Sequence, residues 1–195
     1  IDSVELGLRH DSGELAVDVA AFAMRKRGSV FRDAQGFNVN GARTRHDGIE
    51  AALDVRLAPA WSLAVNATYA RHRYDFDTIA ARGETFVSGR DVDTAPRWMG
   101  SVEFGYDAGG RTRAALQWVH MGRYFADAEN RFDYPGHDLL NLRAAFDANR
   151  RLTVSARLNN LADTDMADRA DYAFGDYRYF PGRGRELFAE FQYRY

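Results

Sequence analysis

Residues 186–195 read Glu-Leu-Phe-Ala-Glu-Phe-Gln-Tyr-Arg-Tyr, and this segment is the clearest indication of the fold class. Every second residue from Leu187 to Tyr195 is apolar or aromatic, and the intervening positions hold most of the charge. Successive side chains of a β-strand point to opposite faces, so the alternation predicts a strand from Glu186 to Tyr195. One face of this strand is apolar and aromatic, and the other is charged.

Eight further segments show the same alternation, each with one face free of charged residues. In residues 49–57, every odd-numbered residue is apolar, whereas Glu50, Asp54 and Arg56 fall on the opposite face. Charged residues make up 28% of the chain. A charged side chain at the bilayer midplane costs on the order of 2–4 kcal/mol, so charge-free faces are typical of strands that contact hydrocarbon. The pattern predicts an outer-membrane β-barrel.

The predicted fold class is all-β, an antiparallel transmembrane β-barrel with about nine up-and-down strands in this chain. Short and long connections alternate, as do the tight periplasmic turns and long extracellular loops of such barrels. The short connections are therefore predicted to be periplasmic. The predicted strands occupy residues 3–10, 14–28, 38–57, 61–76, 96–107, 111–125, 137–147, 150–161 and 185–195.

Whole-chain properties exclude several other classes. The chain has 195 residues, a net charge of −2 and no cysteine. This charge argues against a nucleic-acid partner, and the lack of cysteine excludes disulfide scaffolds, thiolate zinc sites and cysteine nucleophiles. No apolar stretch of about 18 residues is present to form a membrane-spanning helix. The mean hydropathy of −0.48 is uninformative, because alternating strands average lipid-facing and water-facing residues.

The odd strand count and the missing signal peptide both predict further sequence upstream. Bacterial single-chain barrels have an even number of strands, so nine strands are not expected to close alone. An exported protein also needs a leader, which Ile1 and the residues after it do not provide. We therefore expect residues 1–195 to be the C-terminal part of a larger barrel.

Four motifs carry a resemblance to a known family. Residues 158–163 (Leu-Asn-Asn-Leu-Ala-Asp) and 179–185 (Tyr-Phe-Pro-Gly-Arg-Gly-Arg) are the more specific pair. They are similar to the Asn-Leu-Phe-Asp and Pro-Gly-x-x-Arg elements that flank the last loop of TonB-dependent outer-membrane receptors. Residues 42–50 and 57–63 resemble a strand start and a turn of the same family. The sequence departs from the family at Ala162 and Tyr195, where aromatic residues and phenylalanine, respectively, are commoner.

The resemblance implies a 22-stranded barrel, filled by a plug, in the bacterial outer membrane. Such a receptor imports a scarce ligand, such as a ferric siderophore, cobalamin or another metal chelate, and is neither an enzyme nor dependent on a cofactor. The plug and the segment that contacts the TonB complex are expected outside this chain. Outer-membrane lipid and lipopolysaccharide are the implied surroundings, and the barrel assembly machinery is the implied partner of the strand from Glu186 to Tyr195.

Candidate ligand-binding residues lie at the extracellular strand ends and in the long loops. Guanidinium groups suit anionic chelates or lipopolysaccharide phosphates, and aromatic rings at a lumen mouth bind apolar ligand surfaces. The candidates are Arg71, Arg73, Arg123, Tyr124, Phe132, Tyr134, Tyr177 and Tyr179.

Two alternative readings remain open at this point. A small closed barrel that acts as a porin or adhesin would share the apolar faces, but not the two specific motifs. An outer-membrane hydrolase would need a base such as His72 beside Asp75, and the chain has no Gly-x-Ser-x-Gly element. Histidines are not spaced as metal ligands, and the acidic groups near Asp127 and Asp163 lack the glycine of a calcium loop.

Overall fold

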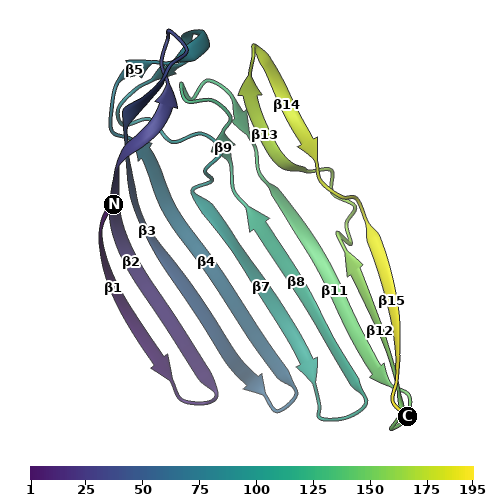
Figure 1. Ribbon diagram of the computed structural model, residues 1–195. Coiled ribbons are helices and arrows are strands. Elements are labelled where there is room, and N and C mark those ends of the chain that lie inside the picture. The colour runs from purple at the N-terminus through teal and green to yellow at the C-terminus, as the bar shows by residue number, and fades with distance from the viewer.

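An antiparallel sheet of nine strands forms the wall of the molecule (Figure 1). The computed structural model describes residues 1–195, except for the side chain at position 82. Neighbours in the chain are neighbours in the sheet, in the order β1-β2-β3-β4-β7-β8-β11-β12-β15. The strands are β1 (Asp2–Asp11), β2 (Leu15–Arg32), β3 (Asn38–Ala58), β4 (Trp61–Tyr74), β7 (Trp98–Asp107), β8 (Thr112–Met121), β11 (His137–Asp147), β12 (Leu152–Asn159) and β15 (Glu186–Tyr193).

The nine predicted strands are confirmed, with differences confined to their ends. β2 continues to Arg32, four residues beyond its predicted end, and pairs with β3 up to Asn38, so these two strands form a long hairpin. β8 ends at Met121, four residues before the predicted end, because the chain turns away at Gly122. Among the described residues, no helix is long and apolar enough to cross a membrane.

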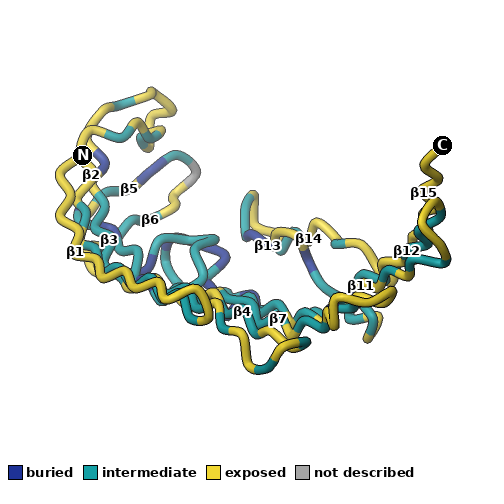
Figure 2. Tube along the Cα trace, turned by 90° about the horizontal axis from the view of Figure 1, so that it is seen from below, coloured by how far each residue is buried: buried dark blue, intermediate teal, exposed yellow. Residues whose placement is uncertain are grey.

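The sheet curves into part of a cylinder, with β1 and β15 as its two edges (Figure 2). The long loops lie on the inner side of the curve, which is the concave face. Side chains alternate between this face and the convex face. None of the four residues Leu53, Val65, Phe104 and Phe191 is buried, and Phe104 and Phe191 are 42% and 72% exposed. The apolar face is therefore the convex face of the sheet, as predicted for contact with hydrocarbon.

Aromatic rings border this apolar face at both ends. Trp61 stacks on Phe104 near the short turns, with ring centroids 4.9 Å apart, and Tyr69 packs on Trp98 at the other end at 4.7 Å. Trp61 and Tyr69 are eight positions apart on β4. That is about 26 Å along a strand, or about 20 Å of height at a 40° tilt, close to the apolar band of about 25 Å. We call Tyr69 and Trp98 the upper girdle.

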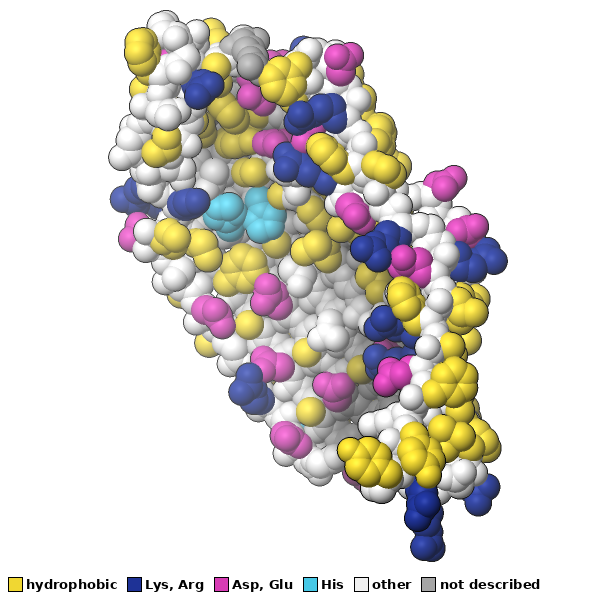
Figure 3. Space-filling view, turned by 45° about the vertical axis from the view of Figure 1, so that its right-hand side comes forward, with side chains coloured by type: hydrophobic (Ala, Val, Ile, Leu, Met, Phe, Trp, Pro, Cys, Tyr) yellow, Lys and Arg dark blue, Asp and Glu magenta, His cyan; other side chains and the backbone are white. Residues whose placement is uncertain are grey.

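The concave face is polar and is cross-linked from strand to strand (Figure 3). Arg143 pairs with Glu103 at 2.5 Å, and the Asn141 amide donates to Gln117 at 3.2 Å. Aromatic side chains are also present on this face. Phe188 lies on the charged face of the last strand, beneath the Arg157 guanidinium, which is 4.8 Å from the ring centroid.

Short turns join the strands at the end of the sheet that holds Trp61 and Phe104. Three of them follow one design, in which a polar side chain accepts backbone N–H groups within the turn. The Asp11 and Asp107 carboxylates each accept the N–H of a glycine two residues on, at 2.8 Å. Gly13 and Gly109 have φ values of 82° and 68°, which side chains with a Cβ rarely adopt.

The long connections carry short strand pairs of their own, which periodicity did not predict. Each pair is antiparallel and separate from the main sheet. These elements are β5 (Thr78–Ile79), the 3-10 helix η1 (Ala81–Gly83), β6 (Thr85–Phe86), β9 (Tyr124–Phe125), β10 (Asp133–Tyr134), β13 (Ala167–Ala173) and β14 (Asp176–Pro181).

Candidate functional site

Three long loops gather at the end opposite the short turns (Figure 1), on the concave side of the sheet (Figure 2). The first loop is residues 75–97, the central loop is 122–136 and the third loop is 160–185. The tip of the β2–β3 hairpin, residues 32–38, lies beside them. We call this end the mouth.

Hydrogen bonds connect the first loop to the central loop. Asn130 accepts the Asp91 N–H through its side-chain oxygen and donates to the Asp91 carbonyl through its amide, both at 2.9 Å. Asp91 is buried, and Arg97 neutralises it with two contacts of 2.9 and 2.5 Å. Glu129 accepts the N–H of Thr85 at 3.2 Å. The two loops therefore form one unit, in which buried polar groups have partners.

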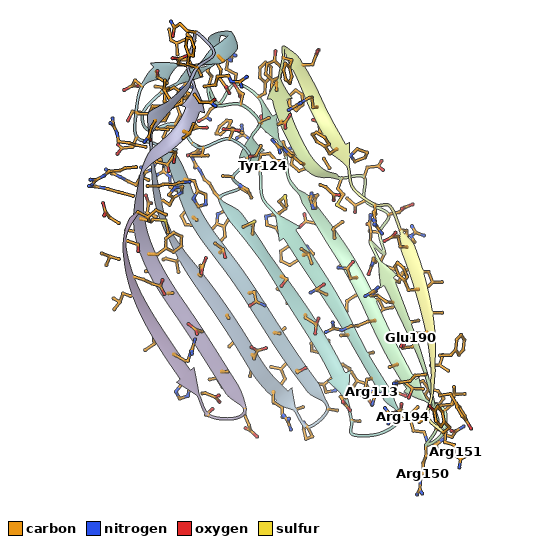
Figure 4. All side chains as sticks on the ribbon, viewed as in Figure 1. Arg113, Tyr124, Arg150, Arg151, Glu190 and Arg194 are labelled. Carbon is orange, nitrogen blue, oxygen red and sulfur yellow. The ribbon has the colours of Figure 1, made fainter. Side chains whose placement is uncertain are left out.

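Tyrosine hydroxyls connect the central loop to the third loop. The Tyr124 hydroxyl accepts the Ala170 N–H at 2.7 Å, and the Tyr134 hydroxyl accepts the Ala167 N–H at 3.0 Å. Both tyrosines are buried, and Figure 4 shows Tyr124 between the loops above the sheet. Tyr177 donates to the Asp133 carbonyl. Burial raises the pKa of Tyr177 to about 12, so its hydroxyl remains a donor at neutral pH.

A buried carboxylate organises the central loop itself. One oxygen of Asp127 accepts the N–H groups of Arg131 and Phe132, each at 2.9 Å, and the other contacts the Arg131 guanidinium at 3.4 Å. The same guanidinium pairs with Glu129 at 3.1 Å. The acidic residues of this loop therefore shape its backbone.

A cavity of about 1130 Å³ opens between the loops and the hairpin tip. Its lining combines guanidinium groups, carboxylates and rings, which suits a large polar ligand with some flat apolar surface. Partial desolvation, and then the charges of Asp93, Asp127 and Glu129, raise the pKa of the Glu84 carboxyl. The lining includes Arg32, Gln35, Glu84, Asp127, Arg131 and Tyr172.

The structure brings together the five aromatic candidates of the sequence. Tyr124 and Tyr134 pack at 5.3 Å, Tyr177 stacks on Tyr179 at 5.2 Å, and Phe132 contacts Tyr177 edge-on at 5.8 Å. Phe132 also stacks on Tyr172, which lines the cavity, at 4.0 Å. Tyr179 is 55% exposed, whereas Tyr124 and Tyr134 are buried and bind other loops.

The three arginine candidates do not share one site. Arg123 borders the aromatic group, pairs with Asp133 at 2.7 Å and covers the Phe125 ring at 5.0 Å. Arg71 and Arg73 follow Tyr69 at alternate positions of β4, so they project from the convex face, outside the mouth.

Residues that line the cavity were largely missed by sequence reasoning. Arg32, Gln35 and Glu84 come from two connections that meet only in the folded chain, and no spacing signal links them. The structure also places His46 opposite His72 on β3 and β4, with their Nδ1 atoms 2.8 Å apart. Among the described residues, no group of three or more metal-binding side chains is assembled.

Comparison with known proteins identifies the family of this nine-stranded sheet. The family described as "TonB dependent receptor-like, beta-barrel" matches residues 1–161, most of the chain. The chain belongs to this family. It is therefore a portion of a TonB-dependent receptor barrel, it resides in the bacterial outer membrane, and it is part of a transporter family and not an enzyme. No curated protein matches the chain.

Solved structures share the fold of this receptor barrel at low sequence identity. The siderophore receptor PiuA from Acinetobacter baumannii has a TM-score of 0.85 at 16% identity, over 99% of this chain and 28% of that protein. The ferric yersiniabactin uptake receptor FyuA from Yersinia pestis has 0.79 at 18%, over 95% and 28%. The copper transporter OprC has 0.73 at 16%, over 98% and 30%. The chain thus spans less than a third of the length of these proteins.

Proposed function

We propose that this barrel section serves the import of a scarce ligand across the outer membrane, and that the ligand is a ferric siderophore or another metal chelate. The observation that carries the proposal is the cavity of about 1130 Å³ at the mouth, enclosed by interlocked loops above a polar concave face. A cavity of mixed polarity at the water-facing end of a membrane barrel is suited to capturing a ligand.

The chemistry of the cavity lining supports the ligand class. Arg32 at the hairpin tip and Arg131 in the central loop offer forked N–H donors, which match carboxylate or catecholate oxygens of a chelate. Tyr172, backed by Phe132, offers a ring surface for its flat organic part. The proteins with this fold named above are receptors or transporters for metal or metal chelates.

We also propose how this chain fits into the whole receptor. Residues 1–195 are the C-terminal part of a 22-stranded barrel, and its lumen holds a plug domain supplied by other sequence of the same protein. The concave face offers that plug charged and amide groups such as Glu103, Asn141 and Arg143. Energy for release into the periplasm comes from the TonB complex, through a segment outside this chain.

Uptake of labelled chelates tests the proposal in cells. A strain without the gene is complemented with the full receptor, either wild type or with Arg32→Gln and Gln35→Ala, which change the cavity lining at the exposed hairpin tip. We expect the wild type to restore uptake of at least one ferric chelate, and the double variant to weaken its apparent affinity about tenfold.

The matched control is Arg150→Gln with Arg151→Gln, which removes charge at the opposite end of the barrel (Figure 4). This control should take up the chelate as the wild type does. Undiminished uptake of every chelate by the strain without the gene would reject the proposal.

A further inference from the structure

Arginines occupy directly opposite positions on three adjacent strands of the convex face. Arg25 of β2 pairs in register with Arg45 of β3, and Arg45 pairs with Arg73 of β4. Arg71 lies two residues before Arg73 and therefore on the same face, opposite Asp47. We call Arg25, Arg45, Arg71 and Arg73 the arginine patch.

The arginine patch lies immediately above the lipid-facing band. Tyr69 of the upper girdle precedes Arg71 by two residues on β4. On β3, which runs the other way, Ile49 is 51% exposed and follows Asp47 by two residues and Arg45 by four. At about 3.3 Å per residue and a 40° tilt, Arg71 is about 5 Å and Arg45 about 10 Å above the girdle. This height is the headgroup level of the outer leaflet.

Ion pairs within the protein do not account for the arginine patch. Like charges directly opposite each other on neighbouring strands destabilise a sheet. Among the described residues, the only ion pair of the patch is that of Arg73 with Asp47, at 2.5 Å. Asp2 is opposite Arg25 at the sheet edge, but it pairs with Arg27 at 3.3 Å. Three positive charges of the patch are left without a carboxylate partner.

Hydrogen-bond donors in the patch also lack acceptors. The Nε–H groups of Arg45, Arg71 and Arg73 are buried among their neighbours, and none has a partner among the described residues. A buried donor without an acceptor costs free energy, which an incoming acceptor recovers. Three such donors, together with unpaired positive charge, are suited to an oxyanion with several acceptor oxygens.

We propose that the arginine patch binds the phosphorylated headgroup of lipopolysaccharide in the outer leaflet. Arg25 and Arg73 are two strand spacings apart, about 10 Å, so the patch spans a headgroup that carries more than one phosphate. Guanidinium groups match phosphate oxygens in bidentate geometry. The patch faces the leaflet and not the lumen, so this lipid site is separate from the mouth and does not depend on the proposed import function.

Binding of defined lipids to the full receptor tests the proposal. The receptor is purified from outer membranes, delipidated in detergent, and titrated with bisphosphorylated lipid A, with dephosphorylated lipid A and with inorganic phosphate, using native mass spectrometry. We expect bisphosphorylated lipid A to bind at least about tenfold more tightly than the dephosphorylated form. Arg25→Gln, Arg45→Gln and Arg73→Gln in combination should abolish this difference.

A matched triple variant controls for loss of charge alone. Arg111→Gln, Arg150→Gln and Arg151→Gln change exposed periplasmic residues and should leave lipid A binding unchanged. Equal binding of both lipid A forms by the wild type, or full affinity in the patch variant, would overturn the proposal. Inorganic phosphate that competes at millimolar concentration would show a general anion site and would also overturn it.

The unfolding temperature distinguishes a lipid site from a structural cluster. Without lipid, removal of three opposed positive charges should leave the unfolding temperature unchanged or raise it, because repulsion between strands is relieved. Lipid A should raise the unfolding temperature of the wild type, but not that of the patch variant. A lower unfolding temperature of the lipid-free patch variant would mean that the arginines stabilise the sheet themselves, which contradicts the proposal.

Discussion

The side-chain amide of Asn160 donates a hydrogen bond to the backbone carbonyl of Arg183, which is 23 residues further along the chain and 3.3 Å away. The same amide donates to the Thr164 carbonyl at 2.9 Å, and its oxygen accepts the Thr164 N–H at 2.8 Å. Asn160 is buried, and its φ of 49° is in the left-handed region that asparagine tolerates. One side chain therefore joins the two ends of the third loop.

This contact explains why the two most specific sequence motifs occur together. Asp163, in the first motif, accepts the N–H of Arg185, in the second, at 2.9 Å. Asn160 and Asp163 thus position the start of β15 beside the end of β12, so the register of the last strand is set before its ladder begins. The motifs are two halves of one junction.

Replacement of Asn160 by alanine should destabilise this junction. The change removes three side-chain hydrogen bonds from a buried site, at an expected cost of about 2–4 kcal/mol in the free energy of unfolding. Urea unfolding of the full receptor in detergent measures this cost. Asn159→Ala, one residue earlier and only partly buried, is the matched control and should cost less than about 1 kcal/mol. Equal stability of the two variants would contradict this account of the motif.

A close approach between strands explains the glycine at position 48. A Cβ there would lie 2.6 Å from the Tyr69 carbonyl oxygen and 2.8 Å from the Phe22 ring. Gly48→Ala should therefore push β3 and β4 apart and cost about 1–3 kcal/mol. Gly7→Ala on β1 is the control, because its Cβ would meet only the Val19 carbonyl, at 3.6 Å. Thermal unfolding compares the two, and a Gly48 variant as stable as the Gly7 variant would disprove the steric argument.

The Tyr124 hydroxyl should be needed to hold the third loop. Tyr124→Phe leaves the ring in place but leaves the Ala170 N–H without its acceptor, at an expected local cost of about 1–3 kcal/mol. Hydrogen exchange at Ala170 measures this cost directly and should accelerate by about tenfold or more. Tyr179→Phe, on an exposed tyrosine, should leave that amide unchanged. Unaltered exchange in the Tyr124 variant would show that the hydrogen bond contributes nothing.

The nine-stranded sheet was predictable from sequence because one of its faces contacts hydrocarbon and the other contacts a polar interior. Hydrocarbon excludes charge from the membrane-spanning part of one face of the sheet, so residues such as Leu53 and Glu50 had to alternate, and period two located all nine strands. The position of Phe188, on the same charged face as Glu190, was not predicted. Its ring lies under Arg157, an amphipathic contact that the alternation rule does not cover.

The mouth was predictable only in part. Aromatic loop residues such as Phe132 and Tyr177 were expected near a ligand, and the structure gathers them. Buried polar contacts between loops, such as that of Asn130 with Asp91, join residues 39 positions apart and leave no periodic trace. The sequence therefore indicated which loops hold suitable residues, but not which residues line the cavity.

The charge of Glu84 should make the mouth less stable as the pH rises. Partial desolvation and the nearby carboxylates raise the pKa of Glu84 above its ordinary value of 4.5, so the folded mouth binds a proton more tightly than an unfolded loop does. The stability that comes from protonation is present below pH 4.5, and it is lost as the pH rises from 4.5 through the raised pKa.

Glu84→Gln keeps an acceptor oxygen but removes the charge, so it should abolish this pH dependence. At pH 7 we expect hydrogen exchange in residues 84–86 to slow by about two- to fivefold, since a full pKa unit corresponds to tenfold and partial exposure weakens the effect. At pH 4 the variant and the wild type should exchange alike. Glu14→Gln, in a periplasmic turn, is the control. Exchange that accelerates in the Glu84 variant at pH 7 would show that the carboxylate stabilises the mouth, which is the opposite of what its surroundings imply.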